Sequence, residues 1–545
     1  MRRVVVAAVL GACFALAAGA GAKVLRVGSF HGVRGQFTSL QAALKAARAG
    51  DWILIGPGDY KTSHVSTPKG APQFPAAVLI TTPRLHLRGM NRKTVIVDGT
   101  KPGSAVCSNK GSAQNFGLAG SASSSATSPY AAVKAAGGAS GVNGLMVFKA
   151  ADVSIENLTA CNFLGGSRDA GNEIWWNGGA GSGKVGGHGF TGQYLTATST
   201  YLKNQSASGE VSAAQYGVFS SNWTGGTWNE IYASNFNDSG FYIGACRQVC
   251  DQTVDHAWAQ FNALGYSGSN SGGRMLIENS QFDHNEDGFD TNSQNGDDPA
   301  PQNGACPAGV APPVKGAHSC WVFIHNNVHD NNNPNVPAAG LAAAGPVGTG
   351  MSVSGGHNDT IMDNTFSDNN AWGVIFVPFL DSGKPCDGGV FGGVLGAQSC
   401  LWDDYGNALV GNTFSHNGSY GHPTNGDFAE VNFLTDPGSN CYGANHDAGG
   451  GAVQPASAAA LQTAMPTCAT TTTQPGSSDG HFLGEVLCDS QVQISPGTPA
   501  SCPSGSYPRV SHIVMHRLPK SLKSMPNPCA GVPSNPWCKP HHGGG

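Results

Sequence analysis

The sequence predicts an all-β fold in which short parallel strands wind into a solenoid. Similar segments open on an apolar residue at Ile231, Val254 and Ile277, two steps of 23 residues. After insertions, the pattern continues at Phe323, Ile361 and Leu409. A spacing in this range is typical of stacked structural repeats. Each segment begins with alternating apolar and polar residues, which indicates a strand with one buried face.

An asparagine recurs eight residues after the start of most of these segments. The positions are Asn262, Asn285, Asn331, Asn369 and Asn417. The segment that opens at Ile231 has Ser239 there instead. Asparagines stacked at one corner of successive turns can form a ladder of amide hydrogen bonds. A glycine then precedes the next strand, as at Gly265 and Gly288, so that one turn holds three short strands.

Length and composition agree with a solenoid. A compact core stops growing at about 250–300 residues, whereas this chain has 545, and a solenoid grows by stacking. Charged residues are 12% of the chain, glycine accounts for 78 residues, and the net charge is −5. Because the sequence has no basic block to meet phosphates, we expect no binding to nucleic acid.

The N-terminus predicts export. Basic residues Arg2 and Arg3 precede an apolar run, and small residues follow at 20–22, the pattern of a secretory signal peptide over residues 1–22. We therefore expect a secreted, extracellular protein. A lipoprotein anchored through Cys13 is the minor alternative. Elsewhere the sequence has no apolar stretch of the ~20 residues that a transmembrane helix needs. The oligomeric state stays open.

The cysteines predict disulfides. Of the 15 cysteines, fourteen remain once the segment with Cys13 is removed, an even number in an oxidising compartment. The plausible local pairs are Cys306/Cys320, Cys386/Cys400, Cys246/Cys250, Cys441/Cys468, Cys488/Cys502 and Cys529/Cys538, which leave Cys107 with Cys161. Other connectivities stay open. A zinc site would need cysteine and histidine clustered at metal-ligand spacing, which the sequence does not offer.

The chain divides into a signal peptide, a solenoid and a tail. Near the start of the solenoid, residues 38–50 predict a short helix that Thr38 or Ser39 caps, placed to cover the open end of the stack. We expect the solenoid over residues 23–435. A tail rich in Cys, Ser, Thr, Pro and Gly follows over residues 436–545.

These features carry a family resemblance over roughly residues 36–435. The helix, the turn Gly-Pro-Gly-Asp-Tyr at 56–60 and the Asn-x-Phe-x-x-Asn turns are similar to those of the right-handed parallel β-helix superfamily, which includes pectate lyases. The resemblance implies a right-handed parallel β-helix with an N-terminal capping helix and a disulfide-rich C-terminal tail. It also implies a polysaccharide or cell-wall glycan as partner, although activities on this scaffold differ.

Four acids in eight residues, from Asp283 to Asp290, form the strongest chemical motif. The stretch resembles Asp-Asp-Gly-Trp-Asp of one pectate lyase family, in which the acids hold a catalytic calcium. The resemblance implies that Glu286, Asp287 and Asp290 are calcium ligands. Such an ion would bind a uronate carboxylate and acidify the neighbouring C–H. A solvated acidic turn and a purely structural calcium are the alternatives.

Other site residues are weaker candidates. The lysine base of the related lyases has no counterpart on the following turn, so Arg274 and Lys315 are the candidates for the base. Trp175, Trp176 and Trp402 stand beside expected loops, where exposed rings could stack on sugars.

Two functions fit these features. One is a secreted protein that binds an extracellular, acidic polysaccharide and cleaves it as a calcium-dependent lyase. A lyase is favoured over a glycoside hydrolase if the protein is an enzyme. The other is a non-catalytic cell-surface or adhesion solenoid that displays loops. The cleft is expected near residues 240–300, between the loops 299–320 and 381–400.

Overall fold

The structure is a computed structural model, and it describes most of the chain outside its loops and termini. The described residues are 21–62, 64–115, 141–165, 171–179, 184–206, 214–295, 301–382, 386–392, 399–433, 440–468, 480–491, 502 and 505–539. The predicted signal peptide, with Cys13, falls almost entirely outside them. Among the described residues, no helix is both long and apolar enough to cross a lipid bilayer.

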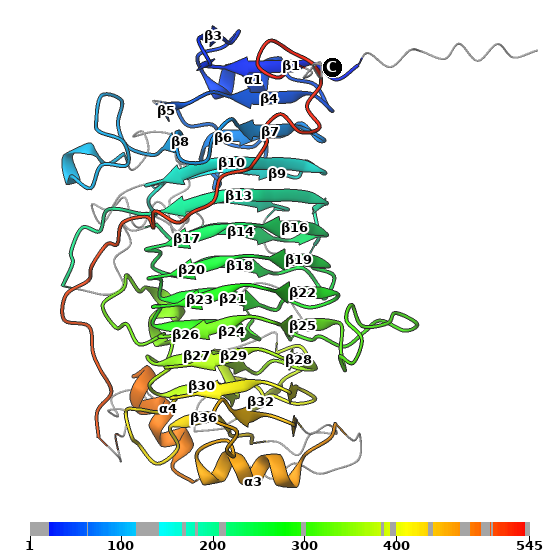
Figure 1. The fold of residues 1–545 in the computed structure, drawn as a ribbon, viewed down its shortest axis with the longest axis vertical. Coiled ribbons are helices and arrows are strands. Elements are labelled where there is room, and N and C mark those ends of the chain that lie inside the picture. The colour runs from blue at the N-terminus through cyan, green and yellow to red at the C-terminus, as the bar shows by residue number, and fades with distance from the viewer. Residues whose placement is uncertain are drawn as a thin grey trace, which may run out of the picture.

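Two long sheets, of ten and of 21 strands, run the length of the molecule (Figure 1). The ten-stranded sheet contains β6 (Ala76–Ile80), β9 (Asn143–Phe148), β11 (Asn172–Asn177), β14 (Tyr216–Ser221), β18 (Ser239–Gly244), β21 (Leu264–Ser269), β24 (Asp287–Asn292), β27 (Thr349–Ser354), β30 (Trp372–Val377) and β36 (Gly426–Glu430).

The 21-stranded sheet contains two rows of strands. The first row is β1 (Val24–Val27), β4 (Trp52–Ile55), β7 (His86–Gly89), β10 (Val153–Cys161), β13 (Phe190–Thr198), β16 (Gly226–Asn229), β19 (Gln252–Asp255), β22 (Met275–Glu278), β25 (Trp321–Ile324), β28 (Asp359–Met362), β34 (Ala408–Val410) and β37 (Cys441–Gly443). The second is β5 (Gly58–Lys61), β8 (Val95–Asp98), β17 (Tyr232–Ser234), β20 (Trp258–Gln260), β23 (Gln281–Asp283), β26 (Asn327–His329), β29 (Thr365–Ser367), β35 (Thr413–Ser415) and β38 (His446–Asp447).

In the part of the chain that the structure describes, three small sheets lie outside this framework. They are formed by β2 (Ser29–Phe30) with β3 (Val33–Arg34), by β12 (Gly187–His188) with β15 (Trp223–Thr224), and by β31 (Phe379–Ser382), β32 (Val390–Gly392) and β33 (Ser399–Trp402). Antiparallel pairing within the described residues is confined to the first and third of these sheets, apart from one isolated bridge.

Each turn of the chain places one strand in the ten-stranded sheet and then passes through the other sheet. The leading apolar residues of successive turns pair in register, as Val254 does with Ile277 and Ile277 with Phe323. They fill one continuous core between the sheets. The chain is therefore a parallel β-helix, as predicted from the repeats.

The predicted asparagine ladder is present. Nδ2 of Asn262 donates to Oδ1 of Asn285 at 3.0 Å, and the same bond links Asn285 to Asn331, Asn331 to Asn369 and Asn369 to Asn417. A second ladder, which the sequence analysis did not identify, starts at the first asparagine of the Asn-x-Phe-x-x-Asn motif. It joins Asn326, Asn364, Asn412 and Asn445.

The predicted register of the first repeat is wrong. Trp228, not Ile231, pairs with Val254, and Phe236, not Ser239, stands at the ladder position, where its N–H donates to Asn262 Oδ1. The step to Val254 is longer because the connections on both sides of β18 contain extra residues, some of them in the loop closed by Cys246–Cys250.

Helices lie at both ends of the stack. α1 (Leu40–Ala46) begins at the N-cap Ser39, whose hydroxyl accepts the N–H of Ala42, and it packs on β1, β4 and β6. α3 (Ala456–Ala464) packs on β36 and β37. The sheet thus continues past residue 435, the predicted end of the solenoid, to β38. Within the described residues, two short 3-10 helices, η1 (Gly111–Ala113) and η2 (Gly340–Ala344), lie in connections.

The end of the chain returns along the solenoid. α4 (Phe482–Ser490) packs against the ten-stranded sheet, where Phe482 meets Trp372. Residues 505–539, which we call the C-terminal strap, then run back to the N-terminal turns (red in Figure 1). There Trp537 joins a cluster with Leu54 and donates its indole N–H to the carbonyl of Val33 at 2.9 Å.

All seven predicted disulfides are confirmed. They are Cys107–Cys161, Cys246–Cys250, Cys306–Cys320, Cys386–Cys400, Cys441–Cys468, Cys488–Cys502 and Cys529–Cys538.

Candidate functional site

The predicted acids lie on and beside the middle of the ten-stranded sheet. Asp287 and Asp290 belong to β24, and Glu286 directly precedes it. Phe289 of this strand points into the core, where it stacks on Tyr266 with ring centroids 4.1 Å apart. Because successive side chains of a strand point to opposite faces, Asp290 points to the outer face.

The carboxylates of β24 are held by hydrogen bonds from neighbouring side chains. Asp290 accepts hydrogen bonds from the amide of Asn292 and from the hydroxyl of Ser354. Asp287 accepts one from the hydroxyl of Ser352 and one from the N–H of Phe289. Both acids are therefore fixed, and both are buried.

Glu286 differs from them, because its Oε2 atom is buried without a hydrogen-bond partner. Two other segments of the chain lie over this part of the sheet. After η2, the N–H of Gly348 donates to the carbonyl of Glu286 at 3.1 Å. From α4, Asp489 brings a further buried carboxylate, and Arg509 of the strap stands 3.7 Å from it. We call Glu286, Asp287, Asp290 and Asp489 the acid cluster.

Burial is the main cause of the raised pKa values in the acid cluster. It raises the pKa of Glu286, Asp287 and Asp489 well above their ordinary values, and that of Asp290 to about 6. The charge of Asp489 adds to the effect at Glu286, and that of Asp290 adds to it at Asp287. The cluster therefore holds protons that exposed acids would release.

The side chains of the acid cluster are not arranged to coordinate a calcium ion. Calcium takes six to eight oxygen ligands at about 2.3–2.6 Å. In the described part of the chain, no three carboxylates of the cluster place an oxygen each within 4.8 Å of one another. Hydrogen bonds already engage Asp287 and Asp290. A calcium ion at Glu286, Asp287 and Asp290 would need these side chains to rearrange.

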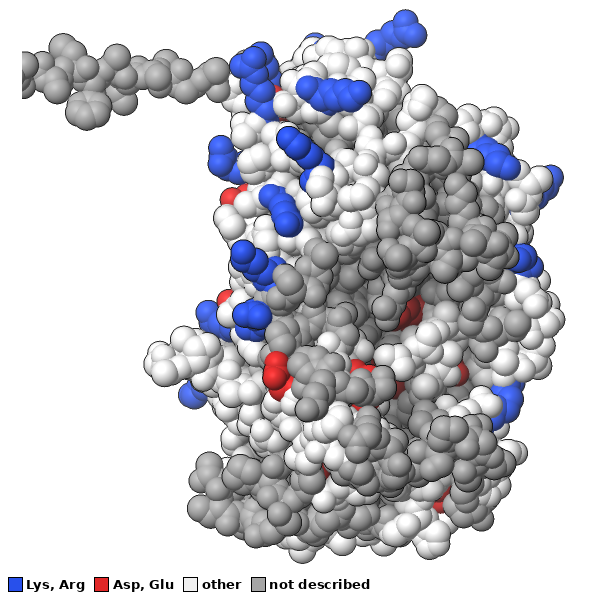
Figure 2. Space-filling view, turned by 180° about the vertical axis from the view of Figure 1, so that it is seen from behind, with Lys and Arg blue, Asp and Glu red and all other residues white. Residues whose placement is uncertain are grey.

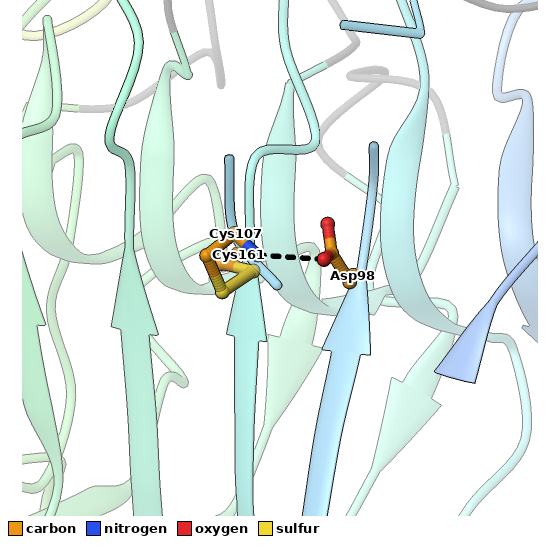
Figure 3. A group of neighbouring side chains, drawn as sticks. All are labelled: Asp98, Cys107 and Cys161. Atoms are coloured by element: carbon orange, nitrogen blue, oxygen red, sulfur yellow. Dashed lines mark hydrogen bonds between the residues drawn. A yellow bond between two sulfur atoms is a disulfide. The ribbon is translucent and has the colours of Figure 1, made fainter. Parts of the chain in front are cut away.

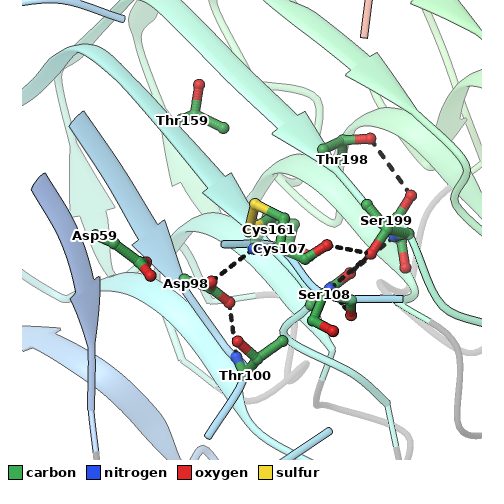
Figure 4. Close-up of a disulfide and its surroundings, with 12 residues drawn as sticks. Asp59, Asp98, Thr100, Cys107, Ser108, Thr159, Cys161, Thr198 and Ser199 are labelled. Carbon is green, nitrogen blue, oxygen red and sulfur yellow. Dashed lines mark hydrogen bonds between the residues drawn. A yellow bond between two sulfur atoms is a disulfide. The ribbon is translucent and has the colours of Figure 1, made fainter. Parts of the chain in front are cut away.

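One group elsewhere has the spacing of a metal site but not its chemistry. Asp98, Cys107 and Cys161 lie together, yet the two sulfurs form a disulfide and are not thiolates (Figure 3). The carboxylate of Asp98 accepts the N–H of Cys107 at 2.7 Å and that of Thr100 at 2.8 Å (Figure 4). It also pairs with Lys61. This group fixes a loop to the solenoid.

The two predicted bases lie away from the acid cluster. Arg274 directly precedes β22 in the other sheet, and its N–H donates to Asp251. Lys315 is exposed in the insertion before β25. Within the described residues, neither side chain contacts the acids. The cation that does stand beside them is Arg509, which the sequence analysis missed because it lies far along the chain.

The three tryptophans expected to be exposed are buried, so that expectation is wrong. Trp176 faces the core and stacks on Phe190. Trp402 donates its indole N–H to the carbonyl of Asp387. Trp175 stands on the outer face of the ten-stranded sheet, but it is 3% exposed because it packs among neighbouring aromatic rings.

A row of outward side chains connects those rings to the acids. Register pairs join Trp175 to Phe219, Phe219 to Tyr242, Tyr242 to Ser267 and Ser267 to Asp290. Figure 2, which shows the molecule from behind, has some of the Asp and Glu in a recess near the middle of the face, whereas Lys and Arg lie mostly in its upper part and toward its edges. The row thus passes from buried rings to buried polar and carboxyl groups.

Comparisons with known proteins find likeness in structure alone. No family model matches the sequence, and the search of curated proteins found none similar to it. The A-module of mannuronan C-5 epimerase AlgE4 from Azotobacter vinelandii is 14% identical, with a TM-score of 0.42 over 80% of this chain and 94% of that one. Alginate lyase from Paenibacillus sp. str. FPU-7 is 10% identical, with a TM-score of 0.31 over 79% and 96%. A family 28 exopolygalacturonase of Yersinia enterocolitica is 9% identical, with a TM-score of 0.38 over 78% and 75%.

Proposed function

We propose that this protein binds an extracellular acidic polysaccharide along the outer face of its ten-stranded sheet and cleaves it at the acid cluster. The observation that carries the proposal is the place of Asp290. It continues the row of Trp175, Phe219 and Tyr242, and its pKa is raised to about 6 by burial. A group that titrates near neutral pH can both accept and donate a proton in a reaction.

The neighbouring acids support a division of roles. Asp287 shares the strand with Asp290, and burial raises its pKa well above the ordinary value, which favours the protonated form of its carboxyl group. In a lyase, Asp290 would accept the proton next to the uronate carboxyl, while protonated Asp287 would be the donor to the leaving oxygen. We favour this elimination over hydrolysis.

A specific observation favours the second candidate function, a non-catalytic solenoid that displays or adheres. α4 and the segment that contains η2 lie over the acids, and neither Arg274 nor Lys315 reaches them. In that case the sheet would bind glycans without cleaving them.

The first experiment separates these two functions. The oxidised protein is mixed with polygalacturonate and with alginate, and binding, ultraviolet absorbance of unsaturated products and new reducing ends are recorded. Products that disappear in Asp290→Asn, and persist in the control Asp255→Asn on the other sheet, support cleavage. Binding without products supports display. Neither binding nor products would contradict both.

Calcium is tested separately by calorimetric titration of the wild type and of the double variant Asp287→Ala/Asp290→Ala. Binding that is lost in the double variant would assign the ion to the acid cluster. If wild type shows no heat of binding at millimolar calcium, the hypothesis of a calcium-dependent lyase is contradicted. The acids would then act only by accepting and donating protons.

We also propose that residues 1–22 direct secretion and that α1 shields the first turn of the solenoid. The seven disulfides fit an oxidising, extracellular compartment, and α1 buries Leu40 and Leu44 against the first strands. Expression with and without residues 1–22, followed by assay of medium and cells, tests the first part. Leu44→Asp, which would charge the covered face of α1, tests the second through the loss of stability.

A further inference from the structure

A second concave surface lies on the other sheet, away from the acid cluster. It is a hollow of about 590 Å³ on the outer face of the 21-stranded sheet, near the N-terminal turns. Volumes of this size are typical of sites for small molecules. The hollow crosses β4, β7, β10, β13 and β16, so that its long direction follows the solenoid axis.

Register pairs arrange its floor in a single row. Trp52 pairs with His86, His86 with Ser154, Ser154 with Thr191, and Thr191 with Thr227. Successive strands of a sheet are about 4.8 Å apart. The row therefore presents two rings and then three hydroxyl groups at regular steps along the axis, which suits a ligand built from repeating units.

Trp52 and His86 form a rigid aromatic wall at one end of the hollow. The rings of Trp52 and His86 stack with centroids 4.3 Å apart and planes 16° apart. Nδ1 of His86 lies 3.0 Å from the hydroxyl of Ser154. Because burial lowers the pKa of His86, its imidazole is neutral at physiological pH and can donate at one nitrogen and accept at the other. The small side chain of Ser154 beside it leaves the hollow open.

One side of the hollow is held by a buried polar network. Arg88 is 6% exposed and Glu156 4% exposed, and the two form an ion pair. Gln193 donates to the other carboxylate oxygen of Glu156 at 2.6 Å. The C-terminal strap completes the network, because Arg88 donates to the carbonyls of Pro528 at 3.3 Å and Ala530 at 2.5 Å. A network with so many partners is preorganised for a ligand.

The charges of the lining decide the class of ligand. Among the described residues of the lining, Arg88 is the single lysine or arginine, and it is already paired with Glu156. Asp152 adds a second carboxylate at the opposite rim. An anionic chain would meet two carboxylates without a free cation. Hydroxyl groups, in contrast, can donate to the carboxylates and accept from Gln193 and Thr191.

We propose that this hollow binds a neutral oligosaccharide that lies along the solenoid axis, with a sugar against the Trp52–His86 wall. It is a site of a different ligand class from the acidic chain assigned to the ten-stranded sheet, and it does not depend on that assignment. The protein would therefore hold two kinds of glycan on two faces.

Calorimetric titration of the full chain with cellohexaose, xylohexaose, mannohexaose and hexagalacturonate tests the proposal. We expect at least one neutral hexasaccharide to bind, and any binding of hexagalacturonate to be the same in wild type and in Thr191→Phe. Thr191→Phe, which fills the middle of the hollow, should weaken the binding of the neutral hexasaccharide by about tenfold or more. The matched control is Thr253→Phe, which lies next in the same row but outside the hollow and should bind as wild type does.

Three results would overturn the proposal. They are no binding of any neutral hexasaccharide at millimolar concentration, equal loss in Thr191→Phe and Thr253→Phe, and tighter binding of hexagalacturonate in the hollow. Thermal unfolding of both variants confirms that they fold. If polygalacturonate is cleaved but no neutral sugar binds, this site is rejected and the proposed function stands. If a neutral sugar binds but polygalacturonate is not cleaved, this site stands and the proposed cleavage is rejected.

Discussion

Asn235 binds the backbone of His516 through both atoms of its side-chain amide. Its Nδ2 donates to the carbonyl of His516 at 2.8 Å, and its Oδ1 accepts the N–H of His516 at 2.9 Å, across 281 residues of sequence. The imidazole of His516 stacks on Phe261 with ring centroids 3.6 Å apart. Asn235, at a corner of the solenoid, thus pairs with the backbone of the strap through one donated and one accepted hydrogen bond, as neighbouring strands of a sheet do.

Asn235→Ala should therefore lower the free energy of unfolding by about 1–3 kcal/mol more than a matched corner substitution, because the backbone groups of His516 lose their partners. The matched control is Asn279→Ala. Both asparagines have a positive φ, 69° and 50°, so that both variants carry the same backbone strain, but Asn279 is exposed and does not contact the strap. Urea unfolding measures the difference, and equal losses would contradict a stabilising role for this contact.

The ladder should be sensitive to a gap in its middle. Asn331→Ala removes an acceptor of two bonds from Asn285 and a donor to Asn369. Because each buried group left unpaired costs about 1–3 kcal/mol, we expect a loss of at least about 3 kcal/mol in urea unfolding. Asn327→Ala, on an exposed position of the same turn, should cost less than about 0.5 kcal/mol. Similar losses in the two variants would argue against the ladder as a source of stability.

The acid cluster should make the protein less stable as pH rises. Since the pKa of Asp290 is raised to about 6, the folded state binds more protons than the unfolded state between about pH 4 and 6. Its contribution is complete below about pH 4 and is lost as pH rises through 6, on the order of 3 kcal/mol. Asp290→Asn should remove this part of the dependence and leave the part that comes from the other acids of the cluster.

The measurement is urea unfolding of wild type and variant at pH 4 and pH 8. Asp290→Asn should be more stable relative to wild type at the higher pH. Ser267→Ala, a neighbour of Asp290 in the same row without a titratable group, should change stability equally at both pH values. If Asp290→Asn changed the free energy of unfolding equally at both pH values, burial would not perturb the pKa of this acid.

The disulfides should differ in their effect according to the loop each one closes. Cys107–Cys161 spans 54 residues and Cys246–Cys250 spans 4. The loss of chain entropy in the unfolded state corresponds to about 4 kcal/mol for the first and about 2 kcal/mol for the second. Double alanine variants compared by urea unfolding test this order. A larger loss from the short loop would show that local packing, rather than chain entropy, dominates.

Features that repeat or lie close in sequence could be predicted. Cys306 and Cys320 frame one insertion, so their pairing follows from the strands that the insertion joins. The ladder asparagines follow apolar residues at a constant distance, since the corner they occupy has the same geometry in each turn. The register of the first repeat could not be predicted, because the constant step of 23 residues does not hold where two longer connections intervene.

Contacts between distant segments could not be predicted. The strap has no periodicity, and it is held through backbone groups, as at His516, which are the same in every residue. Arg509 reaches the acid cluster by this route. For the same reason the burial of Asp287 was not evident, because it depends on α4 and on the segment around η2, which come from elsewhere in the chain.

An open stack of repeats can come apart one unit at a time from either end, because each unit touches only its neighbours. The bond from Trp537 to Val33 changes this, since it ties the end of the strap to the first turns. Unfolding of the N-terminal turns would strain the contacts of the strap, and detachment of α4 would weaken the contacts of the strap at the first turns. The two ends of the solenoid are therefore linked to each other. We expect unfolding to have no preferred starting point along the stack.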